Sequence, residues 1–272
     1  MSIVVSTDAG VTRITLARPE KRNAFDGEML TALQRALADA QADANVRVIV
    51  IQSLGKVFCA GADLKWMAQQ AAGGASANLA GAKRMGGVFH SVSACRKPVV
   101  ARVQGATMGG GVGLASACDI VVAGGAAWFA LSEVRLGLVP AVISPFVVRR
   151  VGPAKARALF MLGGKVSAIE SHRIGLVDVL VDDVPAAPAA GHSALDAAVD
   201  GVLSELVKGA PGAQYACKRL VDGIAWRDPA DVLDFTAHAI ADQRATDEAT
   251  EGITAFLSKR PASWIPSPPD AS

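Results

Sequence analysis

Apolar and polar positions follow two different periods along the chain, and the switch between them predicts an α/β protein. Stretches with an apolar residue every three to four positions predict helices. Short runs rich in β-branched residues separate these stretches and predict strands. The expected strands cover residues 47–52, 98–103, 119–123, 128–130 and 176–181. Strands that alternate with helices in this way are typical of an α/β fold.

The first 44 residues predict a hairpin followed by a helix. Residues 3–5 and 11–16 are expected to pair around the turn Asp8–Ala9–Gly10, where glycine favours a tight reversal. Residues 26–44 predict an amphipathic helix. Its apolar face carries Met29, Leu30, Leu33 and Leu37.

Two later segments interrupt the pattern of strands and helices. Residues 71–82, AAGGASANLAGA, contain mostly small side chains, and we expect a mobile loop that leads into a helix at 83–94. Residues 182–191 are rich in proline and alanine, and the pattern after them is helical to about Leu257. We therefore predict a core at residues 1–190 and a C-terminal helical module at 191–272.

Composition fits a protein with a substantial core and excludes several classes of partner. Of the 272 residues, 51% are hydrophobic, and the formal net charge of +2 gives no reason to expect nucleic acid or a membrane as partner. The N-terminus has no basic and apolar leader, so a cytoplasmic location is expected. The four cysteines form no CxxC pair and the four histidines are scattered, so we expect no metal site.

The segment with the clearest chemistry is a glycine triplet, Gly109–Gly111, between the strand at 98–103 and a helix of small residues. A strand that passes into a helix through glycines leaves backbone N–H groups without partners, and these groups attract an anion. The strand at 47–52 is followed by a similar turn, Ala60–Asp63. Two such turns can direct one N–H each at a single oxygen, which makes an oxyanion hole and predicts an enzyme.

Three motifs resemble those of a known family in order and spacing. They are FCAGADL, QGATMGGGVGLASACD and FALSEVRLGLVP, and RPEKRNAFD and FLSKRPASW extend the match to residues 3–265. These motifs resemble the enoyl-CoA hydratase/isomerase, or crotonase, superfamily. The resemblance implies an α/β fold with a ββα-repeat spiral core, and a C-terminal module that assembles a homotrimer or hexamer. It also implies an acyl-CoA thioester as substrate and no separate cofactor, because coenzyme A is part of the substrate.

The resemblance also assigns roles to individual residues. The backbone N–H groups of Ala60 and Gly110 would form the oxyanion hole and stabilise an enolate. Glu133 would move the proton at the carbon next to the thioester, and apolar neighbours would raise its pKa. Arg22, Ala24, Asp63 and Leu64 would bind coenzyme A, and Phe256 and Lys259 would reach its nucleotide from the end of the chain.

The chain departs from the best-known hydratases at one catalytic position. Those enzymes carry two glutamates, and the first position is Gly113 here. Residues 140–146, PAVISPF, lie where many members of the family have a glycine-rich turn. These changes are most similar to hydratases for branched, carboxylated acyl groups of leucine and terpene degradation, methylglutaconyl-CoA and isohexenylglutaconyl-CoA. We therefore expect the acyl group to use the space at Gly113, with Lys65, Arg84 and Ser144 as candidate partners for its carboxylate.

The sequence leaves three activities open. The leading interpretation is hydration of an α,β-unsaturated enoyl-CoA. A Δ3,Δ2-enoyl-CoA isomerase is the first alternative, because a single glutamate can carry a proton between two carbons without activating water. The second alternative is a catalytically weak subunit that binds acyl-CoA and has lost one carboxylate.

Overall fold

The computed structural model describes residues 2–181 and 193–265, and these form two compact units. The core unit holds the described residues of Met1–Cys95 and Val99–Gly201, and the helical unit holds those of Arg96–Pro98 and Val202–Ser272. The proline- and alanine-rich segment at 182–191, taken as the hinge, lies outside the described residues. Helix α7 (Ala194–Leu206) crosses the division, so its first half belongs to the core unit.

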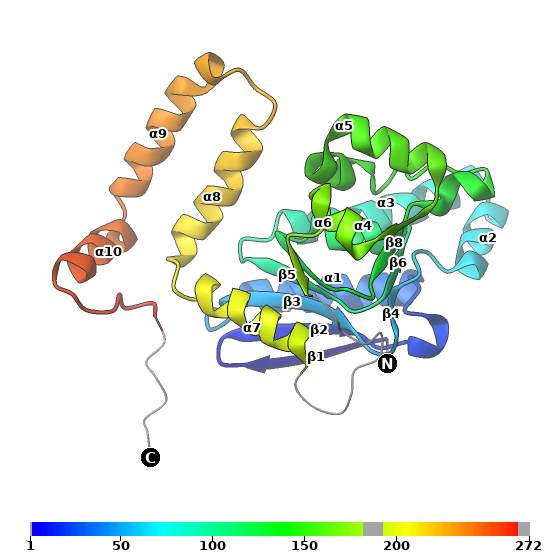
Figure 1. Ribbon diagram of the computed structural model, residues 1–272, viewed down its shortest axis with the longest axis horizontal. Coiled ribbons are helices and arrows are strands. Elements are labelled where there is room, and N and C mark those ends of the chain that lie inside the picture. The colour runs from blue at the N-terminus through cyan, green and yellow to red at the C-terminus, as the bar shows by residue number, and fades with distance from the viewer. Residues whose placement is uncertain (1, 182–192, 266–272) are drawn as a thin grey trace. The chain divides into compact units, whose positions relative to one another are not determined.

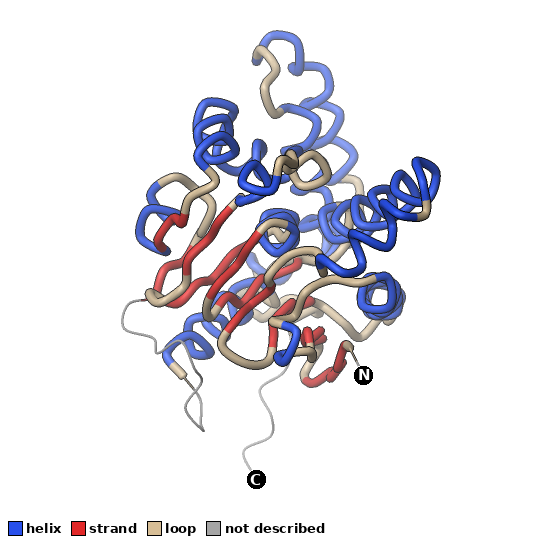
Figure 2. Tube along the Cα trace, turned by 90° about the vertical axis from the view of Figure 1, so that its right-hand side faces the viewer, coloured by secondary structure: helices blue, strands red, loops and turns tan. Residues whose placement is uncertain are grey.

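The core unit contains two sheets, whose strands are red in Figure 2. The larger sheet has the order β1 (Ile3–Asp8), β2 (Val11–Leu16), β3 (Val48–Ser53), β5 (Val99–Val103), β7 (Ile120–Gly124) and β10 (Val179–Val181). The smaller sheet has the order β4 (Val57–Cys59), β6 (Ala106–Met108), β8 (Trp128–Ala130) and β9 (Lys165–Ser167). Pairing is parallel except in the β1–β2 hairpin and the β8–β9 pair.

The chain passes three times from a strand of the larger sheet to a strand of the smaller sheet and then into a helix. The three passes are β3–β4–α2 (Leu64–Ala72), β5–β6–α4 (Gly110–Ala117) and β7–β8–η2 (Ser132–Leu136). This arrangement confirms the predicted ββα repeat. Because β4, β6 and β8 are parallel neighbours, the turns that follow them lie at one edge of the smaller sheet.

The remaining helices surround the sheets or form the helical unit (Figure 1). In the core unit these are α1 (Gly27–Ala42), α3 (Gly74–Ser93), α5 (Ser144–Leu162) and α6 (Ala168–Arg173), with the short η1 (Pro19–Lys21). Helix α1 buries its predicted apolar face, and Asp26 caps its first turn by accepting the N–H of Met29. The helical unit contains α8 (Pro211–Ile224), η3 (Pro229–Val232), α9 (Leu233–Arg244) and α10 (Asp247–Leu257).

The expected mobile loop at residues 71–82 is wrong. The segment is helical in α2 and α3, which are separated only by Gly73. Alanine has the highest helix propensity, so a run of small residues extends the helices instead of breaking them. The break falls at Gly73, and Gly74, the first residue of α3, has a φ of 83° that favours glycine. The three-residue strands β4, β6 and β9 were not predicted, because so few residues show no period.

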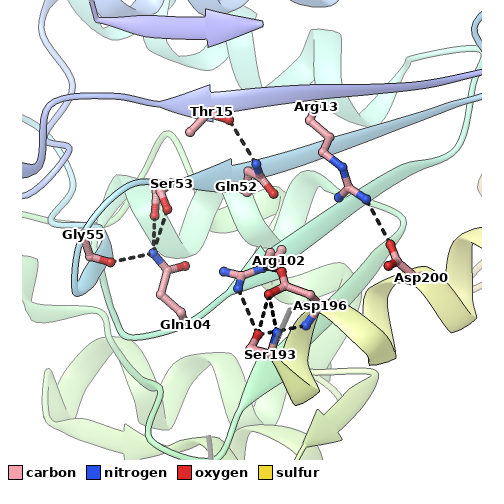
Figure 3. A network of polar contacts seen from close by, with 10 residues as sticks. All are labelled: Arg13, Thr15, Gln52, Ser53, Gly55, Arg102, Gln104, Ser193, Asp196 and Asp200. Atoms are coloured by element: carbon pink, nitrogen blue, oxygen red, sulfur yellow. Dashed lines mark hydrogen bonds and ion pairs between the residues drawn. The ribbon is translucent and has the colours of Figure 1, made fainter. Parts of the chain in front are cut away.

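Polar contacts attach the start of α7 to the larger sheet (Figure 3). Arg102 on β5 is 7% exposed, and its Nε atom donates to Asp196 Oδ1 at 2.6 Å. Arg13 on β2 pairs with Asp200, one turn further along α7, at 3.0 Å. Burial raises the pKa of Asp196, but hydrogen bonds from Arg102 and Ser193 outweigh it and lower the pKa to about 2.

We expect Asp196→Asn to destabilise the core unit by roughly 2 kcal/mol at neutral pH, because Arg102 would stay buried without its carboxylate. The pKa of Asp196 lies below its ordinary value of 3.8, so its contribution is complete above that pH and is lost as the pH falls towards about 2. Chemical denaturation from pH 7 to pH 2 measures this.

The control is Asp200→Asn, because the Asp200 side chain is 45% exposed and its pair with Arg13 should contribute less than about 1 kcal/mol. If the two variants lost equal free energies of unfolding, the Arg102–Asp196 pair would not be the stronger one. The stabilising role of this pair would also be contradicted if the loss in Asp196→Asn were as large at pH 2 as at pH 7.

Candidate active site

A cavity of about 400 Å³ opens where the turns after β4, β6 and β8 face helices α2 and α3. Residues of the segment 136–143 line a further wall. Most lining side chains are apolar, among them Trp66, Met67 and Met85. The polar side chains that line the cavity are Gln70, Asn78, Ser132 and Glu133. All of these residues belong to the core unit, so this unit by itself forms the cavity.

In the turn after β4, the N–H group available to the cavity is that of Ala62, not that of Ala60 as predicted. The N–H of Ala60 donates to the carbonyl of Arg22 at 3.0 Å, so the expectation that Ala60 is an oxyanion-hole donor is wrong. Ala62 forms a parallel bridge with Phe25, in which the residues before and after Ala62 make both hydrogen bonds. The N–H of Ala62 itself therefore faces away from Phe25. Ala62 lines the cavity, and its N–H is the available donor of this turn.

The turn after β6 offers a second candidate donor, the N–H of Gly110, whose role in the oxyanion hole stays a prediction. Gly109 has a φ of 47°, and its N–H donates to Ala130 at 2.9 Å. Gly110 begins α4, so its N–H has no acceptor within the helix. It lines the cavity beside the first turn. A Cβ atom at Gly61 would lie 3.1 Å from the nitrogen of Gly110, which shows how closely the two turns pack.

Glu133 enters the cavity from η2, which follows β8. Its Oε1 atom lies 3.1 Å from the position that a Cβ atom on Gly109 would take. Its Oε2 atom is buried and has no hydrogen-bond partner. Burial raises the pKa of Glu133 above its ordinary value, and a hydrogen bond to its own backbone offsets this only in part. Among the described residues, Glu133 is the only titratable side chain that lines the cavity.

Gly113 does not provide space for the substrate, so its predicted role in substrate binding is wrong. It is buried in α4 and does not line the cavity. A Cβ atom on Gly113 would lie 2.2 Å from Cγ2 of Ile143 and 3.2 Å from the ring of Phe89. Ile143, which does line the cavity, therefore occupies the space that a side chain at position 113 would need.

The residues assigned to coenzyme A differ in where they lie. Leu64 lines the cavity, whereas the carboxylate of Asp63 caps α2 by accepting the N–H groups of Lys65 and Trp66. Arg22 is exposed and Ala24 is buried, and neither lines the cavity. Phe256 and Lys259 belong to the helical unit, so their contact with the nucleotide stays a prediction.

The candidate partners of a substrate carboxylate do not line the cavity. Lys65 and Arg84 are exposed, and the hydroxyl of Ser144 donates to the carbonyl of Ala141 at 2.8 Å. The apolar wall that α2 and α3 provide was not predicted from the sequence. The sequence signal for this wall was the set of large apolar residues Trp66, Met67 and Met85, which lie in stretches that form helices.

The cysteines carry no chemistry in this site. Cys59 is buried beside the first turn, and burial raises its pKa to about 12, so it remains a thiol. Cys95 and Cys118 are also buried, whereas Cys217 is exposed. Within residues 2–181 and 193–265, no group of three or more metal-binding side chains occurs. No helix in that part of the chain is both long and apolar enough to cross a membrane.

Comparison with known proteins agrees with this geometry. The family model for enoyl-CoA hydratase/isomerase matches residues 6–266. Enoyl-CoA hydratase ACTT6 of Alternaria alternata is 36% identical over 216 residues, which cover 79% of this chain and 68% of that protein. The human enoyl-CoA hydratase domain-containing protein 2 is 32% identical over 260 residues, which cover 95% of this chain and 86% of that protein.

A solved structure shows the same fold over nearly the whole chain. The enoyl-CoA hydratase of Shewanella pealeana superposes with a TM-score of 0.90 at 32% identity, covering 97% of this chain and 96% of that one. The extent of these matches, together with the cavity and its two backbone donors, establishes the family. The chain belongs to the enoyl-CoA hydratase/isomerase family, the crotonase superfamily.

Proposed function

We propose that this enzyme adds water to an α,β-unsaturated enoyl-CoA, with Glu133 as its proton-transfer group. The observation that carries the proposal is the buried Oε2 atom of Glu133, which has no partner in an otherwise apolar cavity. A buried carboxylate oxygen without a partner costs free energy of folding, and catalytic groups are a common reason for a protein to carry this cost. The N–H groups of Ala62 and Gly110 complete the set of groups that the reaction needs.

The reaction follows from the positions of these groups. The thioester oxygen accepts hydrogen bonds from the N–H groups of Ala62 and Gly110. Glu133 takes a proton from water as the water oxygen bonds to the β carbon, and the electrons of the double bond move to the thioester oxygen. The resulting enolate is stabilised by about 3 kcal/mol for each donor. Glu133 then returns its proton to the α carbon, so that one water molecule has been added.

The cavity supports a branched, apolar acyl group more strongly than a carboxylated one. Its walls are mostly apolar, and none of the cations considered as carboxylate partners lines it. A carboxylate buried without a cation or a full set of hydrogen bonds is costly, and Glu133 would add repulsion. Of the two features implied by the resemblance, we therefore retain branching. The homotrimer or hexamer and the cytoplasmic location stay predictions.

Isomerisation is a second candidate, and the position of Ile143 favours it. With Ile143 against Gly113, only one carboxylate is available to the substrate in the described cavity. One carboxylate is enough to take a proton from the α carbon of a 3-enoyl-CoA and return it to the γ carbon. Absorbance separates the candidates: hydration removes the conjugated enoyl-thioester band, isomerisation creates it, and a protein that only binds acyl-CoA changes neither.

We expect Glu133→Gln to lower kcat by roughly two to four orders of magnitude, because glutamine cannot exchange a proton with substrate. Binding of a saturated acyl-CoA should remain nearly unchanged. The control is Glu170→Gln, which removes an exposed carboxylate that pairs with Arg173 on the surface. Steady-state kinetics of both variants measures this, and a Glu133→Gln enzyme with most of its turnover would overturn the role.

The same substitution should raise thermal stability at neutral pH. The pKa of Glu133 is raised in the folded protein, so folding loses free energy as the pH rises through the ordinary value of 4.5. Glutamine has no charge to desolvate and avoids this loss. The melting temperature of Glu133→Gln should exceed that of the wild type at pH 7 and approach it near pH 4. A variant that is less stable at pH 7 would indicate a structural role for the carboxylate.

We expect Ala62→Pro to lower kcat by roughly two to three orders of magnitude, because proline lacks the N–H that would hold the thioester oxygen. Since this N–H serves neither of the hydrogen bonds of the Phe25 bridge, both can remain. Circular dichroism checks the fold, and kinetics with a saturating enoyl-CoA checks the rate. An unchanged kcat in a folded variant would place the oxyanion hole elsewhere.

A further inference from the structure

The proposed reaction uses one of the four polar side chains that line the cavity, Glu133, and gives no role to Gln70, Asn78 and Ser132. Of these three, Gln70 has a contact with the neighbouring helix that sets where its side chain can lie. Gln70 lies in the last turns of α2, is half-buried and lines the cavity. Its side-chain amide makes no hydrogen bond with any of the described residues. An amide on the wall of an apolar cavity loses its water when a ligand enters, so it needs a partner on that ligand.

The side chain of Gln70 packs against Gly81, which also lines the cavity. Gly81 is buried in α3, and helices α2 and α3 pack side by side (Figure 1). A Cβ atom on Gly81 would lie 3.0 Å from Oε1 and 3.1 Å from Cγ of Gln70. Even alanine would therefore shift the side chain of Gln70. The absence of a Cβ at position 81 leaves the room that this position of the amide needs.

The amide lies away from the part of α2 that is expected to meet coenzyme A. Leu64, assigned to coenzyme A, begins α2, and Gln70 is six residues further along. Six residues span about 9 Å of an α-helix. The thioester itself is placed by Ala62 and Gly110, which precede α2 and begin α4. Gln70 is therefore a candidate to meet the acyl chain.

We propose, resting on the proposed function, that Gln70 determines acyl specificity by hydrogen-bonding a neutral oxygen, hydroxyl or carbonyl, on the acyl chain of the substrate. An amide both donates and accepts, so it suits either group. A neutral oxygen fits better than a carboxylate, because Glu133 is the only titratable side chain that lines the described cavity. The preferred substrate is then an enoyl-CoA whose otherwise apolar acyl chain carries one such oxygen.

Binding of saturated thioesters tests this without relying on turnover. The probes are hexanoyl-CoA and its 4-, 5- and 6-hydroxy derivatives, and calorimetry gives their dissociation constants. In the wild type, at least one hydroxylated ester should bind as tightly as hexanoyl-CoA or more tightly. In Gln70→Leu, which keeps a similar volume, the affinity for that ester relative to hexanoyl-CoA should fall about tenfold.

Two further variants separate recognition from packing. Gln69→Leu is the matched control, because Gln69 is exposed on the same helix and does not line the cavity, so relative affinities should stay unchanged. Gly81→Ala should also lower the relative affinity, because it moves the amide without removing it. A Gln70→Leu protein with wild-type relative affinities would overturn the proposal, as would a wild type that binds every hydroxylated ester more weakly than hexanoyl-CoA. An enzyme without hydratase or isomerase turnover would instead contradict the proposed function and leave these binding ratios measurable.

Discussion

The site depends on the close approach of two backbone turns at the edge of the smaller sheet. A Cβ atom on Gly61 would lie 2.9 Å from the carbonyl oxygen of Met108, and one on Gly111 would lie 2.5 Å from the carbonyl oxygen of Cys59. Each turn therefore needs a glycine where it meets the other. This contact brings Ala62 and Gly110 to one cavity, where their N–H groups can meet a single oxygen.

The acid–base chemistry depends on how the cavity is filled around Glu133. Its apolar walls desolvate the carboxylate and raise its pKa, which brings proton transfer closer to neutral pH. Ile143 packs against Gly113, so the position of a second glutamate is taken by an apolar side chain. An apolar contact therefore closes this space, and in the proposed reaction Glu133, the one carboxylate that lines the described cavity, performs each proton transfer.

Helices α2 and α3 give the acyl side of the cavity a defined wall. Because residues 71–82 are helical, Trp66, Met67, Gln70 and Met85 take fixed places relative to the turns that hold the thioester. The side chain of Gln70 packs against Gly81, where any larger residue would shift it. In the proposed function, specificity for the acyl group depends on contacts between two helices, whereas activation of the thioester depends on backbone groups that follow the ends of strands.

The sequence by itself determined the α/β class and the repeated strand-to-helix turns, and it indicated Gly110 and Glu133 as candidate site residues, both of which line the cavity. These features are local: period, turn chemistry and residue type act within a few positions of the chain. Only the tertiary structure decided which N–H of the first turn is available, because the partner of Ala60 is Arg22, far from it in the sequence. It also decided that Ile143 fills the space beside Gly113 and that Asp63 caps a helix. Hydrogen-bond partners and occupied volumes depend on segments distant in the chain, and a local pattern holds no information about them.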